Sequence, residues 1–148
     1  GKLKAVITQN IDGLHQKAGS KNVIELHGTA SEFFCPYCSE NADGTKTLEV
    51  IKSGALPKCT HCGGVLKPKV VLYGEPLGDG AVQRAVRSVA DADMLIVGGT
   101  SLAVYPAAGL IDYYRGNKLV LVNKSPTPAD RRADLVIHAP IGEVFSQL

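Results

Sequence analysis

The residues whose types and spacing most clearly indicate chemistry are four cysteines in two pairs. Cys35 and Cys38 form one Cys-x-x-Cys motif, Cys59 and Cys62 form another, and residues 39–58 separate the two. This spacing can direct four thiolates at one Zn²⁺ ion. Two disulfides, four unrelated thiols or a redox pair are the alternatives. The duplicated motif argues against a redox pair, and the lack of an export signal in the sequence argues against disulfides. We therefore predict one zinc ion with all four cysteines as ligands, and such a closed shell is structural rather than catalytic.

Further polar residues follow apolar runs that have the composition of buried strands. Gln9, Asn10 and Asp12 come directly after one such run, and Asn123 ends another. The segment Gly98-Gly99-Thr100-Ser101 lies between a predicted strand and a predicted helix. Ligands of parallel sheets bind outside the carboxyl ends of the strands, where glycines, hydroxyls and backbone N–H groups suit a phosphate or a ribose. Each of these features alone is more often only an ordinary turn.

One histidine has a position that suits a general base. His27 ends the second predicted strand and is followed by Gly28. A single histidine is most often a structural residue, but one at a strand end, in a sheet whose other strand ends carry polar groups, is a better candidate for proton transfer. The other histidines have no such support: we expect His15 on a helix surface, His61 exposed between two cysteine ligands, and His138 without a supporting constellation.

The elements that must position these residues follow from the hydrophobic pattern. We predict strands over residues 3–8, 23–28, 70–73, 94–99, 119–123 and 134–138. We predict helices over residues 12–18, 45–53, 80–90, 106–114 and 143–148. Apolar strands that alternate with helices predict an α/β fold, in which a parallel sheet is covered by helices on both faces. The cysteine-bearing segment has little apolar periodicity, so we predict that it is a small module inserted into this fold.

Length, composition and charge limit the class of function. The chain has 148 residues, of which 45% are hydrophobic, so it can bury a core and is not a disordered chain. It carries 16 Lys and Arg against 14 Asp and Glu, and this net charge of +2 predicts no basic footprint for nucleic acid. The apolar runs are too short to cross a membrane. We expect neither nucleic acid nor membrane as a direct partner, and a cytoplasmic location.

Six motifs together resemble the sirtuin family, the NAD-dependent protein lysine deacylases. They are Thr8-Gln9-Asn10-Ile11-Asp12, His27-Gly28, the two Cys-x-x-Cys pairs, Tyr73-Gly74-Glu75, Gly99-Thr100-Ser101-Leu102 and Val122-Asn123, and they follow the family's order along the whole chain. The resemblance implies a Rossmann-like NAD-binding domain made of residues 1–30 and 67–148. It also implies that the inserted module, residues 31–66, is a zinc ribbon.

The resemblance further implies roles for individual residues. His27 is the general base, and Asn10 and Asp12 belong with it as catalytic residues of the nicotinamide pocket. The implied cofactor-binding residues are Gln9, Ile11, Gly99, Thr100, Ser101 and Asn123. The implied substrate-binding residues, which pair with the backbone of an acyl-lysine peptide or protein, are Val71, Tyr73, Gly74, Glu75 and Val104.

The implied activity is a transfer reaction that converts acyl-lysine and NAD to free lysine, nicotinamide and O-acyl-ADP-ribose. The alternatives are mono-ADP-ribosyl transfer or NAD hydrolysis by the same fold, and a non-enzymatic zinc-ribbon interaction module. The family's Gly-Ala-Gly-x-Ser phosphate loop and first strand are not among these residues, which correspond to roughly three-fifths of such a core. We expect the 148-residue chain by itself to bind NAD weakly, to have little or no activity, and to expose a strand edge at which it dimerises.

Overall fold

The computed structural model describes residues 2–147, and the contacts within it divide the chain into two compact units. The first unit contains residues 5–82, and the second contains residues 83–147 together with residues 2–4. Each unit has its own sheets and its own buried residues. Among the described residues, no helix has the length and apolar character needed to cross a bilayer.

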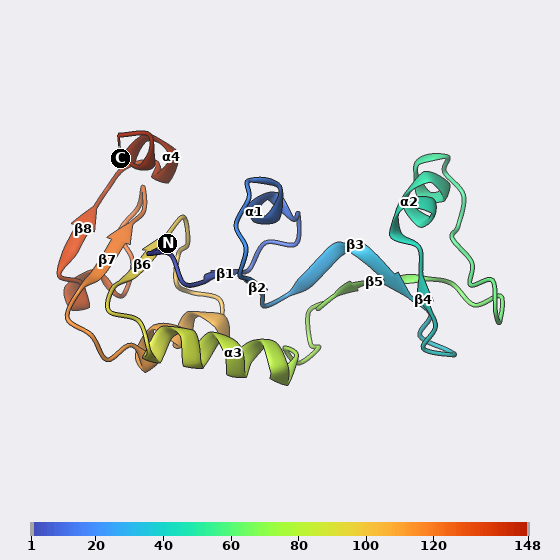
Figure 1. Cartoon of the computed structure of the whole chain (residues 1–148), viewed down its shortest axis with the longest axis horizontal. Coiled ribbons are helices and arrows are strands. Elements are labelled where there is room, and N and C mark those ends of the chain that lie inside the picture. The colour runs from blue at the N-terminus through green and yellow to red at the C-terminus, as the bar shows by residue number, and fades with distance from the viewer. Residues whose placement is uncertain (1, 148) are drawn as a thin grey trace. The chain divides into compact units, whose positions relative to one another are not determined.

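The first unit contains two small sheets. β1 (Val6–Thr8) and β2 (Val23–Glu25) are parallel, with α1 (Leu14–Lys17) between them in the chain. The second sheet is antiparallel in the order β4-β3-β5, and its strands are β3 (Gly28–Phe34), β4 (Asn41–Ala42) and β5 (Lys67–Val70). In Figure 1, β3 and β5 run side by side, as their pairing requires. β3 begins directly after His27 and ends directly before Cys35.

The segment between the two cysteine pairs forms the helix α2 (Gly44–Lys52). Asp43 is its N-cap, and the Asp43 side chain accepts a hydrogen bond from the Lys46 backbone N–H at 3.1 Å. The Thr47 hydroxyl donates to the Asp43 backbone oxygen at 2.7 Å. These bonds satisfy groups that a free helix end would leave without partners, and they confirm the helix that the sequence predicts here.

The second unit is built on a three-stranded parallel sheet in the order β6-β7-β8, formed by β6 (Leu95–Gly98), β7 (Leu119–Val122) and β8 (Leu135–Ile137). The other elements are η1 (Ala107–Tyr113), η2 (Asp130–Arg132), α4 (Ile141–Phe145) and most of α3 (Asp79–Ala90), which leads into this unit. Ile111, Leu119, Leu121 and Ala129 form its buried core cluster. The short apolar strands are typical of a parallel sheet.

The predicted α/β class with parallel strands and an inserted cysteine module is confirmed, but some element boundaries were wrong. The strand expected at residues 70–73 is instead β5, Lys67–Val70. The reason is a turn: the Glu75 N–H donates to the Leu72 backbone oxygen at 3.0 Å, and Gly74 has a φ of 84°. The chain therefore bends away from the sheet where the apolar pattern suggested that it continues.

Other predicted elements are shorter or of another type. The strand predicted over residues 3–8 is β1, Val6–Thr8, and the strand predicted over 23–28 ends at Glu25. The helix predicted over residues 106–114 is a 3₁₀ helix, Ala107–Tyr113. No element was predicted where β3 lies, because Thr29, Ala30, Ser31 and Glu32 lack an alternating apolar pattern.

Candidate metal centre and cofactor site

The four cysteines converge on one point in the first unit. Their sulfur atoms all lie within 4.8 Å of one another, with 3.4 Å between the sulfurs of Cys35 and Cys62 and 3.7 Å between those of Cys38 and Cys59. A tetrahedral zinc ion with Zn–S bonds of about 2.3 Å places its sulfurs roughly 3.8 Å apart. The cluster therefore fits zinc, and the four side chains are positioned to bind one ion, as the sequence predicts.

Two tight backbone loops present these sulfurs. The Ser39 N–H donates to the Cys35 backbone oxygen at 2.8 Å, and the Gly63 N–H donates to the Cys59 backbone oxygen at 2.9 Å. Gly63 has a φ of 75°, which favours glycine. A Cβ atom on Gly64 would lie 2.6 Å from the Tyr37 ring and 3.2 Å from the Cys35 sulfur. Each glycine of the second loop is thus needed for a different reason.

The electrostatics of the cluster also point to a cation. Burial disfavours the Cys35 thiolate, but hydrogen bonds from the Cys38 and Tyr37 backbone and from the Cys62 and Cys38 thiols together outweigh burial and lower the pKa of Cys35 from 9.0 to about 7. A backbone hydrogen bond from Glu40 favours the Cys38 thiolate, yet burial and the neighbouring sulfurs raise the pKa of Cys38 from 9.0 to about 12. One thiolate forms readily and the next is disfavoured, so four thiolates require a positive ion among them.

His27 is held by the backbone that follows β1. Its Nδ1 lies 2.9 Å from the backbone oxygen of Gln9. A carbonyl oxygen can only accept, so Nδ1 carries the hydrogen, and in the neutral imidazole Nε2 keeps the free electron pair. The His27 ring is half-buried and lies in the turn between β2 and β3. The ring of the predicted general base is therefore oriented through Nδ1, and Nε2 is the nitrogen that a base would use.

The segment after β1 carries four predicted site residues, and the main chain of one of them, Gln9, contacts His27. Gln9 and Ile11 are half-buried, whereas Asn10 and Asp12 are exposed. The Asn10 N–H donates to the hydroxyl of the buried Thr8 at 3.1 Å. Asp12 accepts from the Leu14 N–H at 3.0 Å, although the N-cap position of α1 is taken by Gly13. Asp12 therefore bonds to the first residue of the helix, as a cap would, but it lies one residue before the N-cap.

The backbone conformation and the close packing after His27 require a glycine at position 28. It has a φ of 73°, and a Cβ atom at this position would lie 1.9 Å from the Lys69 backbone oxygen in β5. The next residues continue the close approach, since the Val71 N–H donates to the His27 backbone oxygen at 2.9 Å. His27 is therefore bonded through its backbone to the residue after β5 and through its side chain to the loop after β1.

The predicted substrate-binding residues of the first unit lie in and around the turn that ends β5. Glu75 folds back so that one carboxylate oxygen accepts from the Leu72 N–H at 2.9 Å and the other contacts Lys67 Nζ at 2.5 Å. The pKa of Glu75 is lowered below its ordinary value of 4.5, mainly by the hydrogen bond from the Leu72 backbone and secondly by the bond from Lys67. Tyr73 and Gly74 are fully available to solvent or a ligand, with Tyr73 107% exposed.

In the second unit, a hollow of about 270 Å³ lies where β6 and β7 end. Its lining residues are Gly99, Val122, Asn123, Lys124, Ala139, Pro140, Ile141 and Gly142. The structure thus brings together Gly99 and Asn123, two predicted cofactor-binding residues from different strands. Gly99 has a φ of 63°, and a Cβ on Gly98 would lie 2.2 Å from the Ile141 side chain. Two glycines therefore let the chain turn here and let Ile141 pack against the strand end.

Three other predicted residues of this unit follow Gly99 without lining the hollow. Thr100 accepts a hydrogen bond from the Leu102 N–H at 3.2 Å, and this bond supports a turn in which Leu102 has a φ of 52°. Ser101 and Val104 are exposed, Val104 to 53%.

The sequence interpretation missed the second wall of the hollow. Ala139, Pro140 and Gly142 follow β8 and were expected only to lead into a terminal helix. The available signal was positional: these residues follow the carboxyl end of a parallel strand, which is the edge where ligands bind.

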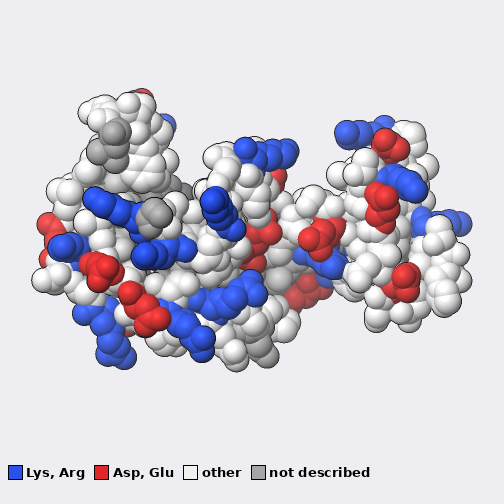
Figure 2. All heavy atoms as spheres, in the orientation of Figure 1, with Lys and Arg blue, Asp and Glu red and all other residues white. Residues whose placement is uncertain are grey.

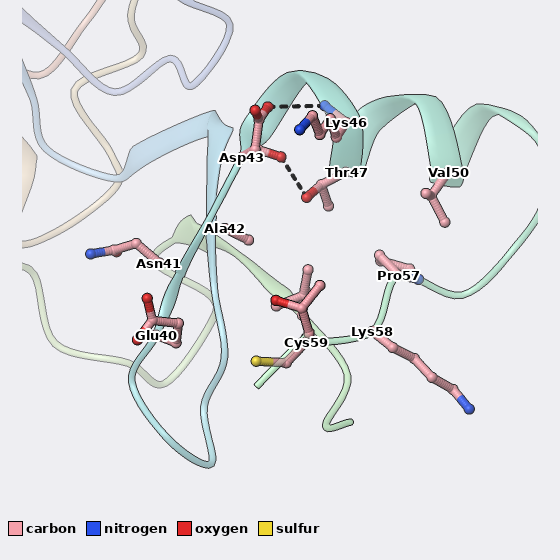
Figure 3. A pocket seen from close by; sticks show the side chains of 12 residues that line it. Glu40, Asn41, Ala42, Asp43, Lys46, Thr47, Val50, Pro57, Lys58 and Cys59 are labelled. Carbon is pink, nitrogen blue, oxygen red and sulfur yellow. Dashed lines mark hydrogen bonds between the residues drawn. The ribbon is translucent and has the colours of Figure 1, made fainter. Parts of the chain in front are cut away.

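A second hollow, of about 330 Å³, lies beside α2 in the cysteine module, and Figure 3 shows the side chains that line it. Thr47, Val50, Pro57 and Cys59 contribute to its wall. Of the predicted site residues, only Cys59 lines it.

Comparison with known proteins identifies the family. The Sir2 family model matches residues 1–106. The chain is 58% identical to an NAD-dependent protein deacetylase of Clostridium perfringens over 149 residues, covering 100% of this chain and 60% of that protein. It is 60% identical to an NAD-dependent protein deacetylase of Clostridium acetobutylicum, covering 98% of this chain and 58% of that protein.

Solved structures agree with the sequence matches. A Sir2 structure with a p53 peptide and NAD⁺ is 41% identical, with a TM-score of 0.89, and the match covers 98% of this chain and 61% of that one. A Sir2 structure bound to acetylated peptide is 40% identical, with a TM-score of 0.90, and the match covers 98% and 62%. The chain spans about three-fifths of the length of these relatives. With a family model over most of its length and close relatives over nearly all of it, the chain belongs to the Sir2 family.

Proposed function

We propose that the complete natural polypeptide containing these 148 residues is an NAD-dependent protein lysine deacetylase. The observation that carries the proposal is the hydrogen bond from His27 Nδ1 to the Gln9 backbone oxygen, which leaves Nε2 as a proton acceptor beside a polar strand end. The curated relatives are named NAD-dependent protein deacetylases. One related structure holds 2'-O-acetyl-ADP-ribose and a deacetylated p53 peptide, the products expected of this reaction.

In this proposal His27 is the general base. A base must carry a free electron pair, be held in one orientation and lie at an accessible surface. His27 is half-buried and fixed at Nδ1, so Nε2 can receive the proton of a hydroxyl group without a change of tautomer. Asn10 and Asp12 expose an amide and a carboxylate on the same loop as Gln9, and we assign them to the same pocket.

We assign NAD binding to residues of each unit, taken by itself. Gln9 and Ile11 belong to the first, and Gly99, Thr100, Ser101 and Asn123 belong to the second. The hollow beside Gly99 and Asn123 fits part of such a ligand, because positive-φ glycine backbone and a side-chain amide suit ribose hydroxyls. When bound, NAD supplies the ribose that receives the acyl group, which makes the reaction a transfer.

We assign substrate binding to the turn after β5 and to Val104. Tyr73, Gly74 and Glu75 are exposed and follow the half-buried Val71, and the Glu75 side chain and N–H both bond to Leu72 and support the turn. Main-chain pairing along such a segment tolerates many peptide sequences.

On the face shown in Figure 2, basic and acidic side chains are interspersed over the surface, so this face offers no extended field of one sign to steer a polyanion.

Two further assignments belong to the same proposal. We divide the chain into a Rossmann-like domain, residues 1–30 and 67–148, and a zinc ribbon, residues 31–66. We place the protein in the cytoplasm, because four free cysteines arranged for zinc are typical of a reducing compartment.

The test is mass spectrometry of the products that the complete polypeptide forms from NAD and an acetyl-lysine peptide. We expect free-lysine peptide, nicotinamide and O-acetyl-ADP-ribose in equal amounts. ADP-ribosylated protein, or nicotinamide without deacetylated peptide, would instead indicate ADP-ribosyl transfer or NAD hydrolysis. No reaction in the presence of bound zinc would contradict an enzymatic function.

A further inference from the structure

His138 connects the two walls of the hollow in the second unit. One wall is Asn123 and Lys124, which follow β7, and the other is residues 139–142, which follow β8. His138 stands directly before the second wall, does not line the hollow itself, and reaches across to the first. We propose that His138 is a positioning residue of the cofactor site, which fixes Asn123 relative to residues 139–142. This inference rests on the proposed function.

The contact with Asn123 is made through the backbone. His138 Nδ1 lies 3.2 Å from the Asn123 backbone oxygen, which can only accept, so Nδ1 donates. The Asn123 N–H donates in turn to the backbone oxygen of Ile137 at 3.1 Å. Both backbone groups of Asn123, its N–H and its C=O, are thus bonded to residues at the end of β8. Of these two bonds, only the one from His138 is made by a side chain.

The Asn123 side chain is oriented separately. Its Nδ2 donates to the Ser125 backbone oxygen at 2.8 Å, which turns the amide along its own loop. The position of this amide therefore depends on the position of the loop, and the loop is the part that His138 secures.

Asp130 lies beside the other ring nitrogen, and because Nδ1 already donates to Asn123, its carboxylate attracts the ring in the protonated form, in which both nitrogens donate. Its Oδ2 lies 3.5 Å from His138 Nε2, while its Oδ1 accepts from both the N–H and the hydroxyl of Thr127, at 3.0 and 2.6 Å. The Thr127 bonds are the main reason that the pKa of Asp130 is lowered, so the carboxylate stays charged beside the ring. A carboxylate that orients a histidine, which in turn orients a third group, is a recurrent arrangement in binding sites.

The exposure of His138 distinguishes this role from core packing. Its side chain is 46% exposed, so its removal leaves no large cavity, and the fold should survive. The sequence suggested no partners for this histidine, because Asp130 and Asn123 lie several residues away on other segments and meet it only in the folded unit.

The test compares His138→Leu, which cannot bond to Asn123, with His138→Asn, whose Nδ2 can take the place of Nδ1. The complete polypeptide is titrated with ADP-ribose by calorimetry, and the KM of an acetyl-lysine peptide is measured separately. We expect His138→Leu to weaken ADP-ribose binding about five- to tenfold, as loss of one hydrogen bond predicts, with the peptide KM changed less than about twofold. His138→Asn should recover most of the affinity. His61→Leu, the same change at an exposed histidine of the cysteine module, is the matched control.

The outcomes separate the two proposals. Wild-type polypeptide that does not bind ADP-ribose would overturn both. Wild-type binding with unchanged affinity in His138→Leu, or with no recovery in His138→Asn, would overturn only the role of His138. If His138→Leu does not fold, His138→Ala decides: we expect the same loss of ADP-ribose affinity, because the bond to Asn123 is removed, and unchanged binding would overturn the inference.

Discussion

The His27 ring and the Gln9 main chain are joined by a single hydrogen bond of 2.9 Å, which crosses from the turn after β2 to the end of β1. In the neutral ring, the bond determines which of the two nitrogens carries the hydrogen. It also means that the orientation of His27 depends on backbone, so a change of the Gln9 side chain should leave that orientation in place.

This bond gives a sharper test of the base than truncation does. His27→Asn keeps an N–H at the position of Nδ1 and removes Nε2, so the loop should stay in place while the proton acceptor is lost. We expect deacetylation by the complete polypeptide to fall by about 10²- to 10⁴-fold, with little change in the unfolding temperature. His15→Asn, on the surface helix α1, is the control. Activity within a fewfold of wild type would remove the assignment of His27.

Zinc content should follow the four cysteines alone. We expect one equivalent of zinc per chain, and its loss on Cys59→Ser or on treatment with a strong chelator, because the remaining thiols cannot complete the shell. Metal analysis and amide hydrogen exchange check this. Exchange should speed up in residues 28–70, since a structural metal stabilises the fold around it. His61→Leu should retain the full equivalent, and a loss of zinc in that variant would show that the four cysteines alone do not account for metal binding.

The close approach at Gly28 predicts a large effect of one methyl group. Gly28→Ala must adopt an unfavourable positive φ and must push the Lys69 backbone away, so we expect a loss of about 2–4 kcal/mol in the free energy of unfolding. At Gly19, φ is 90° and a Cβ would meet nothing within 4 Å. Gly19→Ala should therefore cost only about 1 kcal/mol. Equal losses in denaturant titrations would contradict the predicted clash.

The Glu75 carboxylate should titrate below its ordinary pKa of 4.5. Lys67→Met should raise that pKa only part of the way, because the hydrogen bond from the Leu72 N–H is the larger cause and remains. Lys69→Met is the control, since Lys69 contacts Glu32 instead, at 2.9 Å. Carboxyl NMR titration measures all three.

The same shift determines how Glu75 contributes to stability. A folded-state pKa below the unfolded value stabilises the fold above pH 4.5, and the contribution is lost as the pH falls from there through the folded-state pKa. The free energy of unfolding is measured for wild type and Lys67→Met as a function of pH. The difference between the two should shrink as the pH falls over this range, and a constant difference would contradict the linkage.

The cap of α2 offers a local test in the cysteine module (Figure 3). Asp43→Ala removes the acceptor for the Lys46 N–H, and we expect a loss of about 1 kcal/mol in the free energy of unfolding. Asp43→Ser should recover most of it, because a hydroxyl at the N-cap accepts the same bond. A serine variant no better than alanine would argue that the carboxylate acts through its charge.

The features that the sequence predicted best depend on local spacing. The cysteine pairs and the helix α2 are each determined by residues close together in the chain, and both were predicted. The boundary of β5 was missed because it depends on the side chain of Glu75, which bonds back to Leu72. The second wall of the hollow was missed because residues 139–142 meet Asn123 only through the folding of three parallel strands. The catalytic and binding roles of individual residues stay predictions.

The position of β3, with His27 at one end and Cys35 at the other, has a consequence for which insertions and deletions the chain can accept. One residue more or fewer in β3 would reverse the faces of the strand beyond it and would shift the histidine relative to the metal cluster. Between Cys38 and Cys59, β4 pairs with β3, and the chain then continues through the capped helix α2 and turns, which can change in length without moving β4 or Cys59. Length variation in this module should therefore be confined to residues 45–58, and the seven residues of β3 should keep their number.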